Sequence, residues 1–180
     1  MVIGMENNME YYIVVFVYHK EKYYFIWMTD EEDKFLIENN KILFCKSLKK
    51  IEIYAKKHKI KFAQTEKIIY NIDICEQWCL SLENNVDCNV IINFWNIFLD
   101  LCNSIHMRFL GSDSRFDEIY EKLFCGNNLP AVKITSKKYI PIFLEDEIKQ
   151  IKKVLKSGIN AFLKIVCQGD GSIDDILWRK

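Results

Sequence analysis

Proline, glycine and long apolar runs are all scarce in this sequence. Only two prolines and six glycines occur in 180 residues, while half of the residues are hydrophobic. This composition is far from that of a disordered chain, so we expect an ordered globular protein. No stretch reaches the roughly 18 apolar residues of a membrane span, and the first residues lack the basic and apolar regions of a signal peptide. We therefore expect no membrane association and a cytoplasmic location.

An excess of either charge is also absent, because 25 acidic residues balance 25 basic ones. This balance excludes a basic footprint for nucleic acid over the whole molecule. The charges are nevertheless distributed in blocks. Residues 41–62 hold eight bases and one acid, whereas residues 63–132 hold ten acids and four bases. Such blocks are typical of solvated helix faces, and interaction patches are the alternative.

A disulfide framework is not indicated by the cysteines. There are seven, an odd number, and most lie inside apolar runs. They are therefore interpreted as reduced core residues, as is usual in a cytoplasmic protein.

Metal, phosphate and nucleophile motifs are missing as well. Cys75 and Cys79 share a helix face but have no second ligand pair, so packing is favoured over metal binding. Cys102 and His106 lie one helical turn apart, yet apolar neighbours would raise the pKa of the thiol. Gly169-Asp170-Gly171 lacks the lysine and the flanking elements of a phosphate loop. We predict no catalytic, cofactor or metal site, and hence a protein that is not an enzyme.

The first part of the chain is predicted to form a four-stranded antiparallel meander. Two β-branched and aromatic runs flank the polar turn Lys20–Lys22, and two shorter runs flank Asn39-Asn40, where asparagines tolerate positive φ. Residues 59–63 are a candidate fifth strand. The four main strands are expected at residues 11–19, 23–29, 34–38 and 41–45.

The rest of the chain is predicted to be helical. Capping residues and helical spacing of apolar residues indicate a lysine-rich helix after Ser47, a short helix capped by Asp73 and a long buried helix after Asp87. Gly126 and Pro130 should end a further helix over 116–124. A last helix should run from Leu144 to about Cys167, with acids first and lysines later, as the helix dipole favours.

Together these elements predict one α+β domain over residues 1–180, with the meander packed against a mainly helical C-terminal two-thirds. Its β-rich part covers residues 10–70 and its helical part residues 72–168. The tail of residues 169–180 follows a Gly-Asp-Gly break, and either docks on the body or frays.

The lysine-rich stretch 46–61 is the one candidate for nucleic-acid binding. It has seven lysines but no arginine, and Tyr54 is its only aromatic residue, whereas readers of single strands interleave stacking rings with the charge. A solvated helix face is favoured, and a nucleic-acid-binding or regulatory domain remains the alternative. The lysines are Lys46, Lys49, Lys50, Lys56, Lys57, Lys59 and Lys61.

Several stretches occur in an order that resembles immunity proteins of bacterial polymorphic-toxin and contact-dependent growth-inhibition systems. The resemblance spans residues 10–165 and implies a cytoplasmic antitoxin that binds the C-terminal domain of a cognate toxin and blocks its active site. It implies no particular contact residues, because such interfaces differ from pair to pair. The stretches are YYFIW, NFWNIFLDL, YEKLFCGNNLPAV, YIPIF and DEIKQIKKVLKSG.

If the toxin is a nuclease, acidic residues of this chain are the expected contacts, because charge complementarity speeds association with a basic partner. Tyr120 is expected to serve as an aromatic anchor among them. A solvated helix face is the alternative for these acids. The predicted acidic contacts are Asp100, Asp113, Asp117, Glu118 and Glu121.

Overall fold

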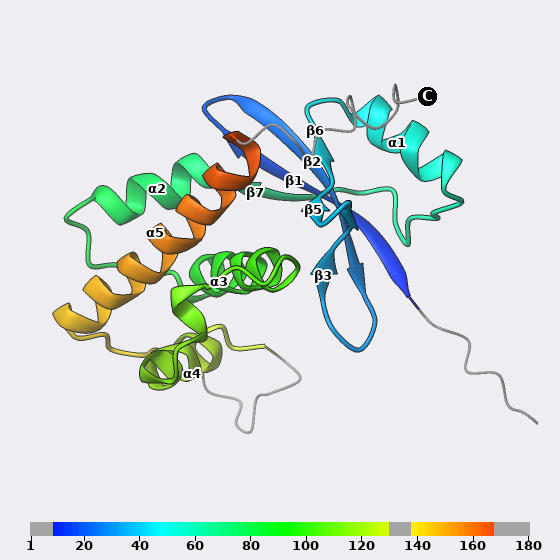
Figure 1. Ribbon diagram of the computed structural model, residues 1–180. Coiled ribbons are helices and arrows are strands. Elements are labelled where there is room, and N and C mark those ends of the chain that lie inside the picture. Colours follow the sequence, from blue (N-terminus) through cyan, green and yellow to red (C-terminus); the bar gives the residue numbers. More distant parts are fainter. Residues whose placement is uncertain (1–8, 130–137, 168–180) are drawn as a thin grey trace, which may run out of the picture. The chain divides into compact units, whose positions relative to one another are not determined.

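The computed structural model describes residues 9–129 and 138–167, and it divides the chain into two compact units (Figure 1). Of the described residues, unit 1 contains 9–71 and 165–167, and unit 2 contains 72–129 and 138–164. Strands lie in the first part of the chain and most helices in the second, which confirms the predicted α+β class. Among the described helices, none combines the length and apolar character needed to cross a membrane.

A long antiparallel hairpin is the centre of the unit 1 sheet. Strands β1 (Glu10–Tyr18) and β2 (Glu21–Thr29) pair along their whole length, with Ile13 opposite Ile26. The turn is shorter than predicted. His19 and Lys20 both have positive φ, which gives the tight two-residue turn that matches the twist of the strands, so Glu21 and Lys22 already belong to β2.

The predicted four-stranded meander is wrong in its pairing. Each of the two short runs breaks at a leucine, Leu36 or Leu43, and these side chains turn toward the core below α1. The outer halves, β3 and β6, both pair with β2, whereas the inner halves form a separate β4–β5 ribbon around the predicted turn at Asn39-Asn40. The bounds are β3 Lys34–Phe35, β4 Ile37–Glu38, β5 Lys41–Ile42 and β6 Phe44–Cys45.

The fifth strand is not the predicted segment 59–63. There, Phe62 makes only an isolated bridge to Tyr11. Strand β7 (Ile68–Asn71) instead pairs with β1 in parallel, so the sheet is mixed and has the order β3-β2-β1-β7. Parallel pairing requires a crossover connection, and the chain between the hairpin and β7 contains α1.

Helix α1 (Leu48–Lys57) covers one face of this sheet (Figure 1). Ser47 is at the predicted N-cap position, but its side chain makes no capping hydrogen bond. Ile51 and Tyr54 are buried against the sheet, and the lysines of the helix lie elsewhere. The opposite face of the sheet carries a cluster of aromatic rings, namely Phe16, Phe25, Phe35 and Phe44.

Within the described residues, unit 2 contains four helices, α2 to α5, and α3 is the most buried of them. Asp87 caps α3 by accepting a hydrogen bond from the Val90 amide, as predicted. Asp73 does not cap α2, because that helix begins one residue earlier and places Asp73 in its first turn. Helix α3 ends at Asn103, before the positive-φ residue His106, so it does not extend over the whole apolar run that follows Asp87. The bounds are α2 Ile72–Leu80, α3 Cys88–Asn103, α4 Asp117–Gly126 and α5 Glu145–Cys167, with 3-10 turns η1 Leu110–Ser112 and η2 Ser114–Phe116.

Aromatic and small residues fix the packing of unit 2. Trp95 on α3 is buried among rings from the residue before η1, from η2 and from α4. Gly158 on α5 lies directly against the ring of Phe98 on α3. The buried cysteines of α2 and α3 are core residues, as predicted, whereas Cys125 and Cys167 are exposed. Pro130, Gly169-Asp170-Gly171 and the tail lie outside the described residues.

Candidate protein-binding surface

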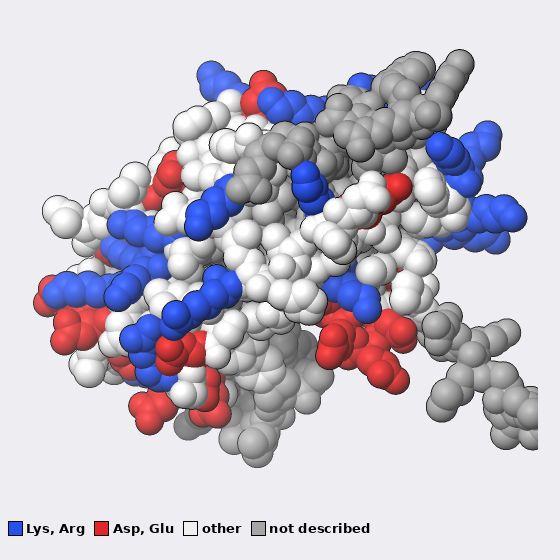
Figure 2. Space-filling view, viewed as in Figure 1, with Lys and Arg blue, Asp and Glu red and all other residues white. Residues whose placement is uncertain are grey.

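The predicted contact acids fall into two groups. Asp117, Glu118 and Glu121 are exposed on one short helix, α4, whose opposite side is held in the core by Ile119 and Leu123. Asp117 and Glu121 are four residues apart and so share a face. These three carboxylates form the acidic face of α4. Figure 2 has acidic side chains over the part of the molecule where Figure 1 places α4 and the start of α5.

Asp100 and Asp113 do not belong to this group. Asp100 is half-buried on α3. The Asp113 carboxylate lies 3.4 Å from the Arg115 guanidinium and 4.0 Å from that of Arg108, and it accepts a hydrogen bond from the Arg115 amide. Its charge is therefore partly compensated within the chain, and its role as the cap of η2 is structural.

Tyr120 is held inside unit 2 rather than presented as a free anchor. Its hydroxyl donates a 2.9 Å hydrogen bond to Oδ1 of Asn96, and its ring meets Trp95 edge to face, with centroids 5.7 Å apart. The side chain is half-buried. Tyr120 therefore fixes α4 against α3, and so positions the acidic face of α4.

A run of exposed apolar residues in unit 2, the segment 139–144 (YIPIFL), was not among the predicted contacts. It has no regular secondary structure. Ile140, Ile142 and Leu144 are 76%, 82% and 67% exposed, while Pro141 and Phe143 between them are half-buried. We call these six residues the apolar segment. Because every residue in it is apolar, the sequence contains no alternation from which the exposed side could have been predicted.

Two contacts hold the apolar segment against α4. A Cβ atom at Gly126 would come within 2.7 Å of Pro141, so only glycine permits this approach at the end of α4. The Asn128 side chain accepts a hydrogen bond from the Tyr139 amide and donates one to the Tyr139 carbonyl, at 2.7 and 2.8 Å. The amide group of Asn128 thus pairs with the segment as a neighbouring strand would.

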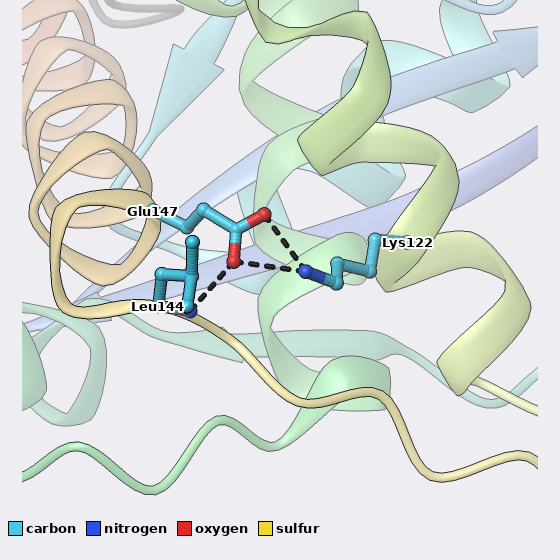
Figure 3. Close-up of polar contacts among 3 residues, drawn as sticks. All are labelled: Lys122, Leu144 and Glu147. Atoms are coloured by element: carbon cyan, nitrogen blue, oxygen red, sulfur yellow. Dashed lines mark hydrogen bonds and ion pairs between the residues drawn. The ribbon is translucent and has the colours of Figure 1, made fainter.

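The third contact is an ion pair between α4 and α5 (Figure 3). Nζ of Lys122 lies 2.8 and 2.9 Å from the two carboxylate oxygens of Glu147 and 5.3 Å from the centre of the Phe143 ring. Glu147 also accepts a 2.6 Å hydrogen bond from the Leu144 amide, as in a capping box at the start of α5. The hydrogen bonds from Lys122 and from Leu144 hold the pKa of Glu147 below its ordinary value.

We expect Lys122→Met to lower the free energy of unfolding by about 1 kcal/mol at pH 7, because it leaves the Glu147 carboxylate without its cation in a partly buried position. The folded-state pKa of Glu147 is depressed, so its stabilising contribution is present above about pH 4.3 and is lost as the pH falls further. The difference between wild type and variant should therefore shrink at pH 3.

Urea unfolding at both pH values measures this difference. Lys149→Met is the matched control, because Lys149 pairs with Glu145 at the surface and should contribute less than about 0.5 kcal/mol. Equal losses for the two variants would contradict the special position of the Lys122–Glu147 pair.

A hollow of about 690 Å³ lies beside the apolar segment. One wall is formed by residues 138–143, and the other by residues 84–89, which lead into α3. Asn127, at the end of α4, also lines it, and the side-chain oxygen of this residue is buried without a hydrogen-bond partner among the described residues. The hollow therefore combines apolar residues with asparagines, one of which, Asn127, has a buried oxygen without a partner among the described residues.

The cysteine and histidine candidates lie on α2, on α3 and just after α3. Burial raises the pKa of Cys102 to about 11, which opposes a role as a thiolate nucleophile, and His106 is exposed. Cys75 and Cys79 are buried together on α2, and the hydrogen bond between them raises the pKa of the Cys75 thiol. No group of three or more His, Cys, Asp or Glu side chains suited to a metal ion occurs within residues 9–129 and 138–167.

The lysine-rich stretch 46–61 lies in unit 1. Lys46 pairs with Glu21 at 3.0 Å and lies over the Tyr23 ring, and Lys50 is half-buried. The remaining lysines are exposed and form a basic surface on and after α1, visible in Figure 2 where Figure 1 places this helix. They are Lys49, Lys56, Lys57, Lys59 and Lys61.

Comparison with known proteins adds no identification. No protein-family model, curated protein or solved structure matches this chain. The surface described above therefore has to be interpreted from its own chemistry.

Proposed function

We propose that this protein is an immunity protein, which binds the toxic domain of a cognate bacterial toxin and blocks that domain's active site. The observation that supports the proposal best is the apolar segment. Its three alternating aliphatic side chains, Ile140, Ile142 and Leu144, are exposed at two thirds or more of their surface. Exposed apolar groups bordered by polar ones are typical of protein interfaces. An inhibitory complex needs such a contact surface.

The acidic face of α4 supports a basic partner. Its three carboxylates are carried by a helix that Trp95, Tyr120 and the Lys122–Glu147 pair hold in place. Because the helix is ordered before binding, the backbone that carries these charges loses little conformational freedom when a partner docks. A nuclease toxin has a basic surface for its substrate, and an acidic inhibitor would be attracted to that surface.

The proposal is tested by expressing this chain with the C-terminal domain of the protein encoded directly upstream of it. We expect a stable complex on co-purification and restored growth of cells that produce the toxic domain. The absence of both a complex and a rescue would refute the proposal for that pair. A nuclease partner would in addition lose its activity on DNA or RNA when this chain is added in equal amounts.

Charge neutralisation on α4 should slow the association. We expect Asp117→Asn, Glu118→Gln and Glu121→Gln together to lower the association rate constant about tenfold at low salt, with a much smaller change in the dissociation rate. The difference from wild type should fade at high ionic strength, because exposed charges are then screened. Surface plasmon resonance at two salt concentrations measures both rates.

The matched control is a triple neutralisation at the exposed turn between β2 and β3, with Asp30→Asn, Glu31→Gln and Glu32→Gln. It removes the same charge from the chain, so it separates a local effect of α4 from an effect of net charge. Equal slowing by both triple variants would contradict a binding role for the acidic face of α4.

The alternative function is binding of nucleic acid by the exposed lysines on and after α1. Phosphate contacts would release counterions, so affinity for a random RNA or DNA oligonucleotide should fall steeply with salt. Lys56→Gln, Lys57→Gln and Lys59→Gln would weaken such binding, whereas the α4 variants would not. Salt-sensitive binding together with failure of the toxin experiment would favour this alternative.

A further inference from the structure

The apolar segment has the side-chain pattern of an extended strand. Its exposed residues, Ile140, Ile142 and Leu144, alternate with the half-buried Pro141 and Phe143. Side chains of an extended strand point alternately to opposite faces. One face therefore packs on α4, where Pro141 meets Gly126 and Phe143 lies beneath Lys122, and the other face of three aliphatic side chains is left to solvent.

The middle of the segment, residues 140–143, makes no backbone hydrogen bond to another described residue. The amides of Ile140, Ile142 and Phe143 make no hydrogen bond to any other described residue, whereas the Tyr139 amide and carbonyl are both bound by Asn128. Exposed backbone groups with no partner are the feature of a strand edge that accepts another chain. Asn128 therefore pairs with Tyr139, and the next backbone groups along the segment have no hydrogen bond to another described residue.

The hollow beside the segment is lined by amide side chains. Its opposite wall contains Asn84, Asn85 and Asn89, and Asn127 lies at its end with a buried oxygen that has no donor within the described part of the chain. The Asn89 oxygen accepts a hydrogen bond from Asn93, so its amide N–H groups are what it can offer a ligand. Each asparagine amide can both donate and accept, as a peptide group does. The groups around the hollow therefore match the hydrogen-bonding needs of a polypeptide backbone.

From these observations we infer that the hollow is a docking groove for one extended strand of the partner protein. The strand pairs with the backbone of residues 140–143, which has no hydrogen bond to another described residue, and covers Ile140 and Ile142, as in other cases of strand addition to an open edge. This assignment deepens the proposed function, and its identification of the partner as a toxin domain rests on that function.

The charge around the groove selects the sequence of the strand. Helix α4 and residues 138–149 hold six acidic and three basic residues. One of the bases, Lys122, is neutralised by Glu147, and another, Lys149, lies between Glu145 and Asp146. The partner strand should therefore carry alternating apolar residues for the segment and lysine or arginine at its ends.

The groove can be tested without knowing the toxin. A phage library of random twelve-residue peptides is selected on the full-length chain, and the strongest peptide is measured by fluorescence anisotropy. We expect alternating apolar residues with basic ends in the selected sequences. The double variant Ile140→Asp/Ile142→Asp should bind that peptide at least about tenfold more weakly, since both changes place a carboxylate in an apolar contact.

The matched control is Ile53→Asp, which changes an exposed isoleucine of α1 and should leave peptide affinity within about twofold. Circular dichroism of both variants verifies that they are folded, as expected for exposed positions. Backbone pairing is tested separately with two versions of the peptide, N-methylated on the odd or on the even residues. At least one version should lose binding, because methylation removes the N–H groups of one strand edge.

Several results would contradict the proposal that the hollow is a docking groove. They are no selected peptide, selected peptides without the alternating apolar pattern, equal binding to the double variant, and binding that tolerates both N-methylated peptides. Self-association of the chain that the double variant abolishes would assign the groove to a second copy instead.

Hydrogen exchange in the complex with the upstream domain links the groove to the proposed function. The amides of residues 140–143 should become protected. A complex that protects other residues would refute the groove as the toxin contact and leave the immunity function intact. Peptide binding without any complex or rescue would instead refute the function and leave the groove.

Discussion

Trp95→Ala is expected to lower the free energy of unfolding by about 3–5 kcal/mol, the largest stability loss for any single substitution considered. The Trp95 side chain is 1% exposed, and its ring meets three others edge to face. The partners come from the loop before η1, from η2 and from α4, so one side chain joins three elements to α3. They are Phe109, Phe116 and Tyr120, at centroid distances of 6.4, 6.4 and 5.7 Å.

Urea unfolding followed by circular dichroism measures this loss, and Trp95→Phe is the control that keeps an aromatic ring of smaller volume. The control should lose clearly less stability than the alanine variant. Under conditions where Trp95→Ala is still folded, the proposed function predicts faster dissociation from the toxin domain, because Tyr120 and the acidic face of α4 lose their support. A loss below about 1 kcal/mol would show that the ring cluster does not fix α4.

Gly158→Ala is expected to destabilise the protein by about 1–3 kcal/mol, although alanine is the better helix former. A Cβ atom at Gly158 would lie 2.2 Å from Cδ2 and 2.3 Å from Cγ of the Phe98 ring. Phe98 is fully buried, so its ring cannot move away without disturbing the core. The close crossing of α3 and α5 therefore depends on the missing side chain.

A second variant tests this cause directly. Asn160→Ala makes a helix-favouring change at an exposed position of α5 and should leave stability equal or slightly higher. Phe98→Leu should be less harmful in the Gly158→Ala background than alone, because the smaller side chain makes room for the new methyl group. The double-mutant cycle from thermal unfolding gives the coupling energy between the two positions. Additive losses would contradict a clash between them.

Elements defined by neighbours in sequence could be predicted, and those defined by distant partners could not. The hairpin of β1 and β2 and the helix that Asp87 caps follow from local side-chain patterns and capping chemistry. The pairing of the two-residue strands depends on where Leu36 and Leu43 are buried, and β7 forms because β1 offers a free edge. Neither condition can be read from a short window of sequence.

The candidate surface was predicted only in part. Exposure of the acids on α4 follows from their helical spacing, because Ile119 and Leu123 occupy the opposite side. The engagement of Asp113 by Arg108 and Arg115 depends on loop geometry that spacing does not determine. The exposed side of the apolar segment could not be predicted, because it is defined only when Pro141 packs on Gly126.

The residues that stabilise α4 are different from the residues that it exposes, and this separation affects how the surface could evolve. Its buried residues and its links through Tyr120 and Lys122 determine the stability of the helix, whereas Asp117, Glu118 and Glu121 are exposed. Substitutions at exposed positions usually change stability by less than about 0.5 kcal/mol. Under the proposed function, partner preference can therefore drift through these three positions over successive generations while the inherited scaffold stays the same.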